Sequence, residues 1–442
     1  MRTFRCHARV ASVLCCASLA LAAAPSATAA PSATAAPSAS YASARAGLPA
    51  GDGWASAEGG TTGGAKADKA HTFTVTNRAE LAKALAGGDT APRLIYVKGT
   101  IDANTDDSGK PLSCADYATD GYGLDAYLAA YDPATWGDAQ PSGPQEDARA
   151  ASAAVQATRV KLAVPSNTTI AGAGRDARLL GASLQVTGAD NVIIRNLTFE
   201  DAYDCFPAWD PTDGAEGAWN SEYDNLVVYG STHVWVDHNT FTDGRRPDSA
   251  QPRYYGQLYQ QHDGELDVVR GADLVTASWN VFADHDKTLM IGNSDSAGAT
   301  DRGKLRVTLH HNVFKNIVER APRVRFGKVD AYNNHYIAPA DGYVYSWGVG
   351  VESQLYAEAN ALTLPGTVDR AKVIKQWKGT ALTEENNYVN GKPVDLLAVH
   401  NAGVPAEQLG DDAGWTPTLR TRVDAPRAVP GIVDGRAGAG RL

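Results

Sequence analysis

The feature that most constrains the fold is a short motif that recurs from about residue 190 onward. Each copy has three residues of strand-like alternation, a polar bend and then a large apolar residue. Six copies begin at positions 192, 234, 275, 307, 329 and 355, so their spacings are 42, 41, 32, 22 and 26 residues. An asparagine stands at the bend of the last five copies, at Asn239, Asn280, Asn312, Asn334 and Asn360.

This spacing predicts a solenoid, because a coil of about 22 residues has room for short strands but not for an intervening helix. An asparagine at a bend can satisfy neighbouring backbone groups, and stacked copies would form a ladder along one edge. We therefore predict an all-β fold, a right-handed single-stranded parallel β-helix with a peripheral capping helix and long loops. The capping helix is expected after Asn77, where Glu80 completes a capping box, and a second helix is expected at 144–156.

The first three copies are longer than the others, and their extra residues lie at 200–233, 242–274 and 283–306. Insertions of this kind map to loops on one face of a solenoid, which is often the binding face. The loops are rich in acidic residues, whose oxygens suit calcium. For any single acid, a solvated loop remains the alternative.

Positive charge recurs close to these acids. Lys287 lies in the third insertion, and Arg320, Arg323 and Arg325 follow within one short stretch. Arg323 and Arg325 would share one face of a strand by its period of two. Their partners would be internal carboxylates or an anionic ligand.

The chain divides into three parts. Residues 1–30 carry three arginines, an apolar stretch and a small-residue cleavage site, which indicates a secretory signal peptide. Residues 31–69 are expected to be a low-complexity flexible segment, and 70–442 the β-helix domain, with a C-terminal extension packed on it or partly disordered.

Charge and cysteine content restrict the partners. The net charge is −10, and removal of residues 1–30, with three arginines and no acid, would change it to −13. We expect no nucleic-acid partner, no membrane span after the signal and a secreted, extracellular monomer. Cys114 and Cys205 would remain after cleavage and are predicted to form a disulfide, with two separate buried thiols as the alternative.

Four ordered motifs give the chain a specific resemblance. From about residue 75 to 390 it resembles the pectate lyases of polysaccharide lyase family 1, and in particular their Bacillus-type extracellular members. The motifs are Val234-Trp235-Val236-Asp237-His238, Gln261-His262-Asp263-Gly264 with Asp267, His285-Asp286-Lys287, and Arg320-Ala321-Pro322-Arg323-Val324-Arg325. The resemblance implies the same β-helix fold that the repeat spacing predicts.

The resemblance also implies roles for individual residues. The primary calcium ligands would be Asp224, Asp263 and Asp267, and Glu222 matches a position that is a ligand in only some members. Arg320 matches the catalytic base, Lys287 and Arg325 match residues that bind the substrate uronate, and Arg323 has a supporting place beside the substrate. Asp237 and His238 belong to the signature as structural residues. The family lends no support to a disulfide at Cys205.

The implied activity is calcium-dependent β-elimination of de-esterified polygalacturonate, which gives 4,5-unsaturated ends. A pectin lyase acting on methyl esters, a non-catalytic glycan-binding β-helix and an inverting glycosidase are the alternatives. An arginine is an unusual base because its pKa is above about 12. We expect calcium, Arg323 and Arg325 to lower the pKa of Arg320, since positive neighbours disfavour a second cation.

Overall fold

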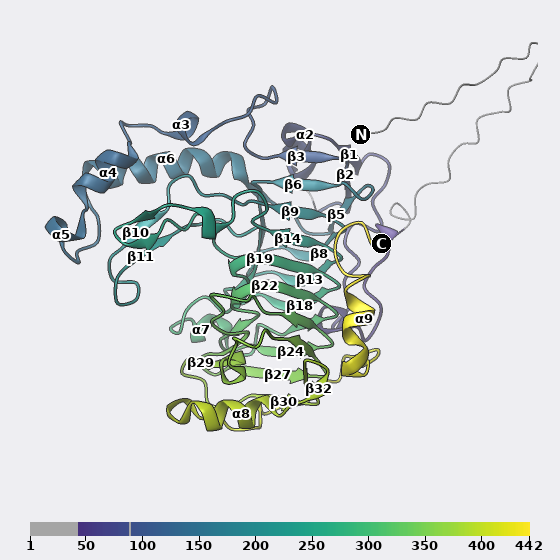
Figure 1. The fold of residues 1–442 in the computed structure, drawn as a ribbon. Helices are drawn as coiled ribbons and strands as arrows, with labels where there is room; N and C mark the ends of the chain where they lie inside the picture. The colour runs from purple at the N-terminus through teal and green to yellow at the C-terminus, as the bar shows by residue number, and fades with distance from the viewer. Residues whose placement is uncertain (1–42, 88–89) are drawn as a thin grey trace, which may run out of the picture. The chain divides into compact units, whose positions relative to one another are not determined.

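Three parallel sheets surround one apolar core in the computed structural model, which describes residues 43–87 and 90–442 (Figure 1). Successive strands pass from sheet 1 to sheet 2 to sheet 3 and back, so each turn of the chain adds one strand to each sheet. This is the right-handed parallel β-helix predicted from the repeat spacing.

The strands of each sheet follow one another along the stack. Sheet 1 contains β1 (Thr72–Val75), β2 (Arg93–Val97), β5 (Thr168–Gly172), β8 (Asp190–Arg195), β13 (Thr232–Asp237), β18 (Asp273–Ser278), β21 (Val307–His310), β24 (Lys328–Tyr332), β27 (Gln354–Glu358) and β30 (Thr383–Glu385). Sheet 2 contains β3 (Thr100–Asp102), β6 (Arg178–Leu180), β9 (Thr198–Glu200), β14 (Thr240–Thr242), β19 (Val281–Lys287), β22 (Val313–Glu319), β25 (His335–Ile337), β28 (Ala361–Thr363), β31 (Tyr388–Val389) and β32 (Lys392–Pro393), of which β32 pairs antiparallel with β31. Sheet 3 contains β4 (Lys161–Ala163), β7 (Ser183–Thr187), β12 (Leu226–Tyr229), β17 (Leu266–Val269), β20 (Met290–Ile291), β23 (Arg323–Val324), β26 (Trp347–Val349) and β29 (Ile374–Gln376).

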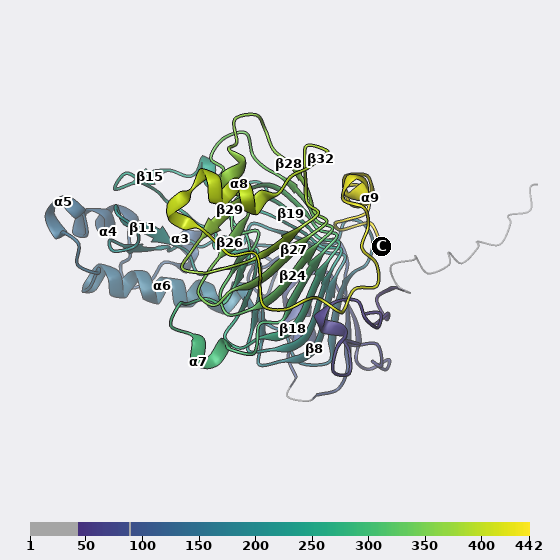
Figure 2. The ribbon, with the colours of Figure 1, turned by 90° about the horizontal axis from the view of Figure 1, so that it is seen from below.

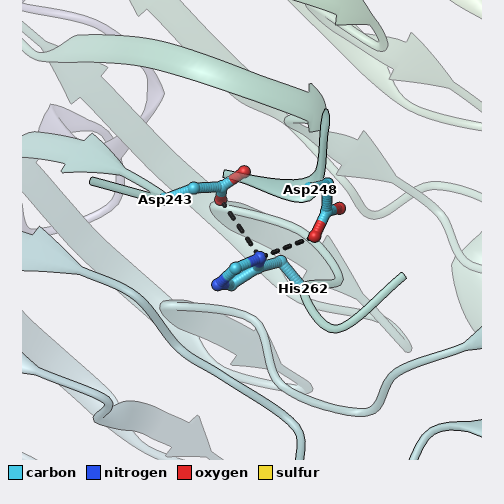
Figure 3. A group of neighbouring side chains, drawn as sticks. All are labelled: Asp243, Asp248 and His262. Atoms are coloured by element: carbon cyan, nitrogen blue, oxygen red, sulfur yellow. Dashed lines mark hydrogen bonds and ion pairs between the residues drawn. The ribbon is translucent and has the colours of Figure 1, made fainter. Parts of the chain in front are cut away.

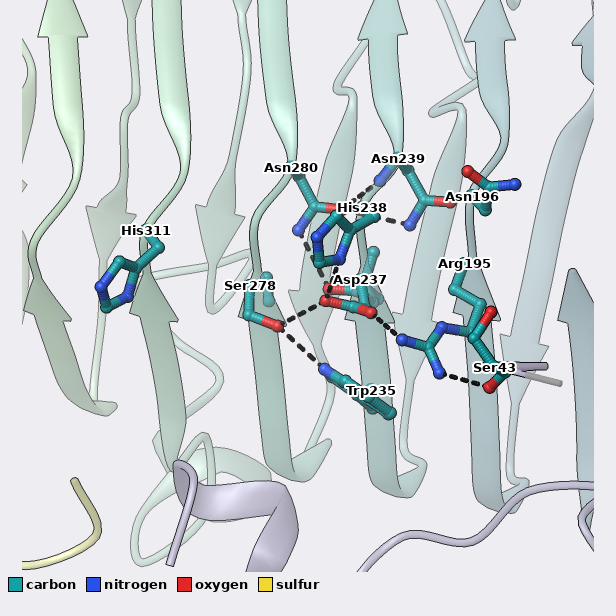
Figure 4. A network of polar contacts seen from close by, with 12 residues as sticks. Ser43, Arg195, Asn196, Trp235, Asp237, His238, Asn239, Ser278, Asn280 and His311 are labelled. Atoms are coloured by element: carbon teal, nitrogen blue, oxygen red, sulfur yellow. Dashed lines mark hydrogen bonds and ion pairs between the residues drawn. The ribbon is translucent and has the colours of Figure 1, made fainter. Parts of the chain in front are cut away.

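The asparagine ladder forms at the bend between sheets 1 and 2. The Nδ2 of Asn239 donates to Oδ1 of Asn280 at 3.1 Å, and Asn280 in turn donates to Asn312 at 3.0 Å. The ladder continues through Asn334 and Asn360 and includes Asn387, one coil beyond the predicted copies. Each ladder amide also bonds backbone groups that the bend removes from the sheets, so the ladder satisfies buried polar atoms at every turn (Figure 4).

The interior of the bend is equally repetitive. Rings stack along the axis with centroid separations of 4.8 to 5.0 Å, close to the distance of about 4.8 Å between neighbouring strands. The stacked rings belong to Phe199, Phe241, Phe282, Phe314 and Tyr336. The apolar residue that closes each sequence motif is thus the core residue of its coil.

Helices lie outside the coils. The predicted capping helix is α2 (Arg78–Leu85), where the Asn77 side chain accepts from the Glu80 amide and Leu81 is fully buried. The helix lies against β1 and β2 (Figure 1). The predicted helix at 144–156 is α6 (Pro144–Val160). The remaining helices are α3 (Cys114–Tyr117), α4 (Leu124–Ala130), α5 (Pro133–Trp136), α7 (Gly298–Asp301), α8 (Leu396–Gly403) and α9 (Val429–Val433), with 3-10 turns η1 (Trp54–Ser56), η2 (Asp248–Ala250), η3 (Arg370–Val373), η4 (Pro405–Glu407) and η5 (Pro426–Ala428). None of the helices in the described ranges is both long and apolar enough to cross a membrane.

The insertions build a lobe beside the coils. Two small hairpins, β10 (Ala208–Asp210) with β11 (Ala218–Asn220) and β15 (Arg253–Tyr254) with β16 (Gln257–Leu258), pack with α4 and α5 through an aromatic cluster. The helix α6 packs against α3 and α4. The cluster contains Tyr127, Tyr131, Trp209, Trp219 and Tyr259. A disulfide joins Cys114 on α3 to Cys205 and ties this lobe to the loop that follows β9.

The segments before and after the coils both pack on the domain. Residues 31–69 are predicted to be flexible, and 31–42 of them lie outside the described residues. Residues 43–69 instead lie along sheet 1, where the Ala55 amide donates to Thr276 Oγ1 at 3.0 Å and Ala55 is fully buried. Small side chains allow this close approach. The composition rich in small residues, which suggests flexibility, therefore lets this segment pack on the sheet. The C-terminal extension is packed, since Arg420 pairs with Asp330 and α9 buries Val433. The predicted signal peptide, 1–30, lies outside the described residues.

Candidate functional site

Three carboxylates converge at the start of β12 and β17 in sheet 3. Asp224 precedes β12, Asp267 lies on β17, and Asp263 lies in the loop before β17. The Gly264 amide donates to Asp224 Oδ1 at 2.8 Å, and the Met290 amide donates to Asp267 Oδ1 at 3.0 Å. A Cβ at Gly264 would lie within 2.7 Å of an oxygen of both Asp224 and Asp267, so both carboxylates close against the same piece of backbone.

The electrostatics of these acids are strained. Burial and the charges of Asp267 and Asp263 raise the pKa of Asp224 well above its usual value. Burial and the charge of Asp263 raise the pKa of Asp267 to about 7. Like charges held together in a poorly solvated place favour a bound multivalent cation. The hard oxygen donors fit Ca²⁺, so the residues present match the metal that the family resemblance implies.

Glu222 is not brought into this group. Its side chain is exposed, and its carboxylate lies 3.4 Å from Lys161 Nζ. It is also absent from the main charges that shift the pKa of Asp224 and Asp267. The structure therefore separates the weaker ligand candidate from the three converging acids.

Arg320 directly follows β22 and lies close enough to Asp263 and Asp267 for their charges to act on it. Its Nε is 3.0 Å from Glu319 Oε1, and the side chain is 17% exposed. Burial alone would lower the pKa of Arg320, but Glu319, together with Tyr345, Asp263 and Asp267, raises it. The lowering expected from Arg323 and Arg325 is therefore wrong, because the neighbouring acidic groups outweigh burial, whereas the lowering expected from bound calcium stays a prediction.

Lys287 and Arg325 differ in their surroundings. Lys287 ends β19 and stands opposite Glu319 in the parallel ladder with β22, so it flanks the same carboxylate as Arg320. The Arg325 side chain is mostly buried, and its Nε donates to Asp295 Oδ1 at 2.7 Å. Arg325 Nη1 donates to the Gly292 carbonyl at 2.8 Å. Asp295 thus orients Arg325 at the edge of the site, whereas Lys287 keeps a partly exposed ammonium group.

Arg323 is the least paired of these cations. Its guanidinium lies 4.3 Å from the centre of the Trp377 ring. Within 43–87 and 90–442 its side chain makes no hydrogen bond or ion pair, and its Nε is buried without a partner. Burial and the charge of Arg325 lower the pKa of Arg323.

A buried network of histidines and carboxylates supports the acidic loop from behind. His285 Nε2 lies 2.6 Å from the carbonyl oxygen of Asp263, and its Nδ1 lies 2.6 Å from Asp243 Oδ1. His262 Nδ1 lies 2.7 Å from Asp248 Oδ1 and 3.7 Å from Asp243 Oδ1 (Figure 3). Burial opposes the charge on His262, but bonds to Asp201 and Asp248 raise its pKa to about 9.

The close grouping of Asp243, Asp248 and His262 has the spacing of metal ligands. The raised pKa keeps His262 protonated near neutral pH, and an imidazolium has no lone pair to offer a metal. We therefore assign this group as a set of ion pairs.

The motif around Asp237 lies on sheet 1, away from the converging acids. Asp237 pairs with Arg195 and accepts from Ser278 Oγ at 3.0 Å, while His238 Nδ1 lies 2.8 Å away (Figure 4). Burial opposes its charge, but His238 and Arg195 lower the pKa of Asp237. Arg195 also donates to the Ser43 carbonyl at 2.8 Å, so the motif fixes the N-terminal segment and is structural, as the sequence suggested.

Sequence reasoning did not identify several residues that shape the site. Glu319 follows strand residues and precedes Arg320, but its effect on Lys287 depends on the register of β19 and β22. Asp295 and Trp377 come from loops remote in sequence from the arginines they contact. His285 was visible in its motif, but its bond to the Asp263 carbonyl requires the folded insertion.

Comparison with known proteins gives consistent matches. The profile of the pectate lyase family matches residues 10–126 and 142–404. A pectate lyase of Bacillus subtilis is 49% identical over 89% of this chain and 93% of its own length. Pectate lyase E of Dickeya chrysanthemi is 37% identical over 88% of this chain and 86% of its own length.

Solved structures agree. A mutant of Bacillus subtilis pectate lyase superposes with a TM-score of 0.86 at 48% identity, over 90% of this chain and 99% of that one. A pectate lyase bound to a hexasaccharide gives the same TM-score, identity and coverage.

Proposed function

Because this chain belongs to the pectate lyase family, we propose that it is a secreted, calcium-dependent lyase that cleaves de-esterified α-1,4-polygalacturonate by β-elimination. The observation that carries the proposal is the convergence of Asp224, Asp263 and Asp267 beside Arg320. A cluster of buried carboxylates that raise one another's pKa would bind Ca²⁺, and the adjacent cations would bind uronate.

The acids and the cations divide the work on one sugar. Asp224, Asp263 and Asp267 would hold calcium. Bound there, Ca²⁺ would draw charge from the substrate carboxylate, acidify the proton at C5 and cancel acid charges that keep Arg320 protonated. Lys287 would bind the same uronate from its partly exposed position beside Glu319.

Arg320 is the proposed base. It would accept the C5 proton, the released electron pair would form the C4–C5 double bond, and the C4–O bond would break. The leaving oxygen would take a proton from water, and the hydroxide so formed would take the proton from Arg320, so the base is restored and no water is consumed. The products are a saturated end and a 4,5-unsaturated end. Carboxylates raise the pKa of Arg320, so its neutral fraction is small and the rate should climb with alkaline pH.

Secretion is part of the proposal. It is supported by the arginine-led apolar stretch within residues 1–30, which lies outside the described residues. The disulfide between Cys114 and Cys205 also favours an oxidising compartment.

The test is the ultraviolet absorbance of the conjugated uronate product. Polygalacturonate should give a rising absorbance with Ca²⁺ and none with a chelator, and Arg320→Lys should be the inactive control. A faster reaction on fully methyl-esterified pectin would favour a pectin lyase. Binding without absorbance would favour a glycan-binding protein, and reducing ends without absorbance would favour a glycosidase.

A further inference from the structure

A cavity of about 410 Å³ opens where the lobe joins the coils. Its walls come from residues 102–114, 203–205 and 245–246, and among the described residues none of the acids or cations assigned to the catalytic site lines it. Figure 2 shows α3, which begins at Cys114, with α4 to α6 to one side of the coils. Cys114 and Cys205 both line the cavity, so their disulfide joins two of its walls. A cavity of this size is in the range of small-ligand sites.

Two neighbouring arginines at this cavity share one buried carboxylate. Nε of Arg245 and Nε of Arg246 each donate to Asp201 Oδ2 at 2.9 Å. Asp201 is fully buried, and Nε2 of His262 lies 3.1 Å from its other oxygen. Burial opposes its charge, but His262, Arg246 and Arg245 lower the pKa of Asp201. One ionised carboxylate therefore serves three cationic side chains.

Both arginines keep donors that a ligand can use. The Arg245 side chain is 49% exposed, and within the described residues its two Nη groups make no hydrogen bond or ion pair. Arg246 is held from two sides, since its Nη2 lies 2.8 Å from Asp201 Oδ2 and its guanidinium lies 3.6 Å from the centre of the Tyr203 ring. A guanidinium held by a carboxylate and an aromatic face presents its remaining N–H groups in a fixed direction, which suits an anion.

An acid in the same cavity restricts which anion fits. Asp102, at the end of β3, lines the cavity, and its Oδ1 accepts from the Asn104 amide at 2.8 Å. No described residue donates to its Oδ2. The bond to Asp201 raises the pKa of Arg245, and the charge of Asp102 adds to this effect. Asp102 repels a ligand that carries only negative charge, but its free oxygen can accept from a ligand hydroxyl.

We propose that this cavity binds a small hydroxylated carboxylate, the class to which a free uronate belongs, at a site separate from the calcium acids. The ligand carboxylate would lie on the free N–H groups of Arg245 and Arg246, and a ligand hydroxyl would donate to Asp102. The inference does not depend on the proposed lyase activity, because the lining residues take no part in it.

The experiment titrates the intact protein with galacturonate in the presence of a chelator, which keeps Ca²⁺ away from the catalytic acids. Ligand-observed NMR should show saturable binding with a dissociation constant of roughly 1 mM or below. Arg245→Gln should weaken this binding about tenfold or more, because it deletes donors to the ligand carboxylate. Arg253→Gln is the matched control, since Arg253 is an exposed arginine of the same insertion outside this cavity. Its affinity should equal that of the unchanged protein.

A second probe, inorganic phosphate, tests the ligand class. Galacturonate should bind the unchanged protein more tightly than phosphate does. Asp102→Asn should reduce this preference about threefold or more, because it removes repulsion of both probes but a charged acceptor of the sugar only. Arg245→Lys should recover part of the affinity lost in Arg245→Gln, since it keeps the charge without the fork.

Three results would overturn the inference. The first is the absence of saturable galacturonate binding, or binding that is equal in Arg245→Gln and the unchanged protein. The second is a loss in Lys287→Ala in place of Arg245→Gln, which would put the sugar at the catalytic cations. The third is tighter binding of phosphate than of galacturonate, which would make the cavity a general anion site.

Discussion

Two walls of the solenoid each bury a carboxylate, and they treat it in opposite ways. On sheet 1, Asp237 is paired with Arg195, Ser278 and His238, and its pKa is lowered despite burial. On sheet 3, Asp267 has two acids for neighbours, and its pKa is raised to about 7. The same type of side chain is thus paired with cations in one wall and crowded by other acids in the other.

The difference separates structure from function. A fully bonded carboxylate has nothing to gain from a ligand, whereas a crowded one gains from a cation. Paired and crowded carboxylates also occur close together, since Asp243 pairs with His285 directly behind the acidic loop. A strongly shifted pKa therefore indicates a ligand site only where the carboxylate has no cationic partner that neutralises it within the fold.

The largest effect is expected at the base beside the crowded acids. Arg320→Lys should lower turnover by about 100-fold or more while oligogalacturonate still binds in Ca²⁺. The shorter, point-like ammonium cannot reproduce the guanidinium at that place. Initial rates and calorimetry check this, with Lys287→Arg as the comparison. Near-normal turnover in Arg320→Lys, together with a dead Lys287→Arg that still binds, would make Lys287 the base.

The second prediction removes one crowded carboxylate. Asp267→Ala should weaken Ca²⁺ binding by about 100-fold, because it deletes a charged ligand of the cluster. Activity should return in part at high Ca²⁺, since Asp224 and Asp263 remain. The free energy of unfolding without Ca²⁺ should not fall, because repulsion is relieved. Normal calcium dependence in this variant would contradict the assignment.

The third prediction applies the reverse change to the paired wall. Asp237→Asn should lower the free energy of unfolding by about 3 kcal/mol, because Arg195 loses its buried counter-ion. The calcium affinity of the folded protein should stay unchanged. Denaturant unfolding and calcium titration measure the two quantities. A calcium defect without loss of stability would erase the distinction between the two walls.

The smallest effect is expected at Glu222. Its carboxylate and Lys161 form an exposed pair, 61% and 35% exposed, which contributes little to stability. Glu222→Gln should change the calcium affinity by less than about threefold and the free energy of unfolding by less than about 0.5 kcal/mol. A loss as large as that of Asp267→Ala would return Glu222 to the ligand set.

The regular parts of this molecule could be predicted because they repeat. Asn239 and its successors stand at the same place in every coil, and the motif reports local geometry that each coil satisfies in the same way. The lobe could not be predicted in this way. Helices as short as α3 and α5 have little stability alone, and they depend on the aromatic cluster and the disulfide.

The residues of the site could be predicted from the sequence, but the directions of their pKa shifts could not. Family motifs identified Asp263 and Arg320, yet the direction of the Arg320 pKa depends on Glu319 and on how closely the acids approach. The pairing of Arg325 with Asp295 joins residues 30 positions apart. Such contacts depend on how the insertions fold over sheet 3, which no local pattern encodes.

The most direct test of the crowded acids on sheet 3 is proton release on calcium binding. An Asp267 with a pKa of about 7 is largely protonated at pH 6 and ionised at pH 9, so Ca²⁺ must displace protons only in the acidic range. Calorimetric titrations in buffers of different ionisation enthalpy should show release of about one proton or more at pH 6 and almost none at pH 9, with affinity rising as pH rises through 7. Calcium binding that releases no proton at pH 6, or no calcium binding at all, would contradict the account.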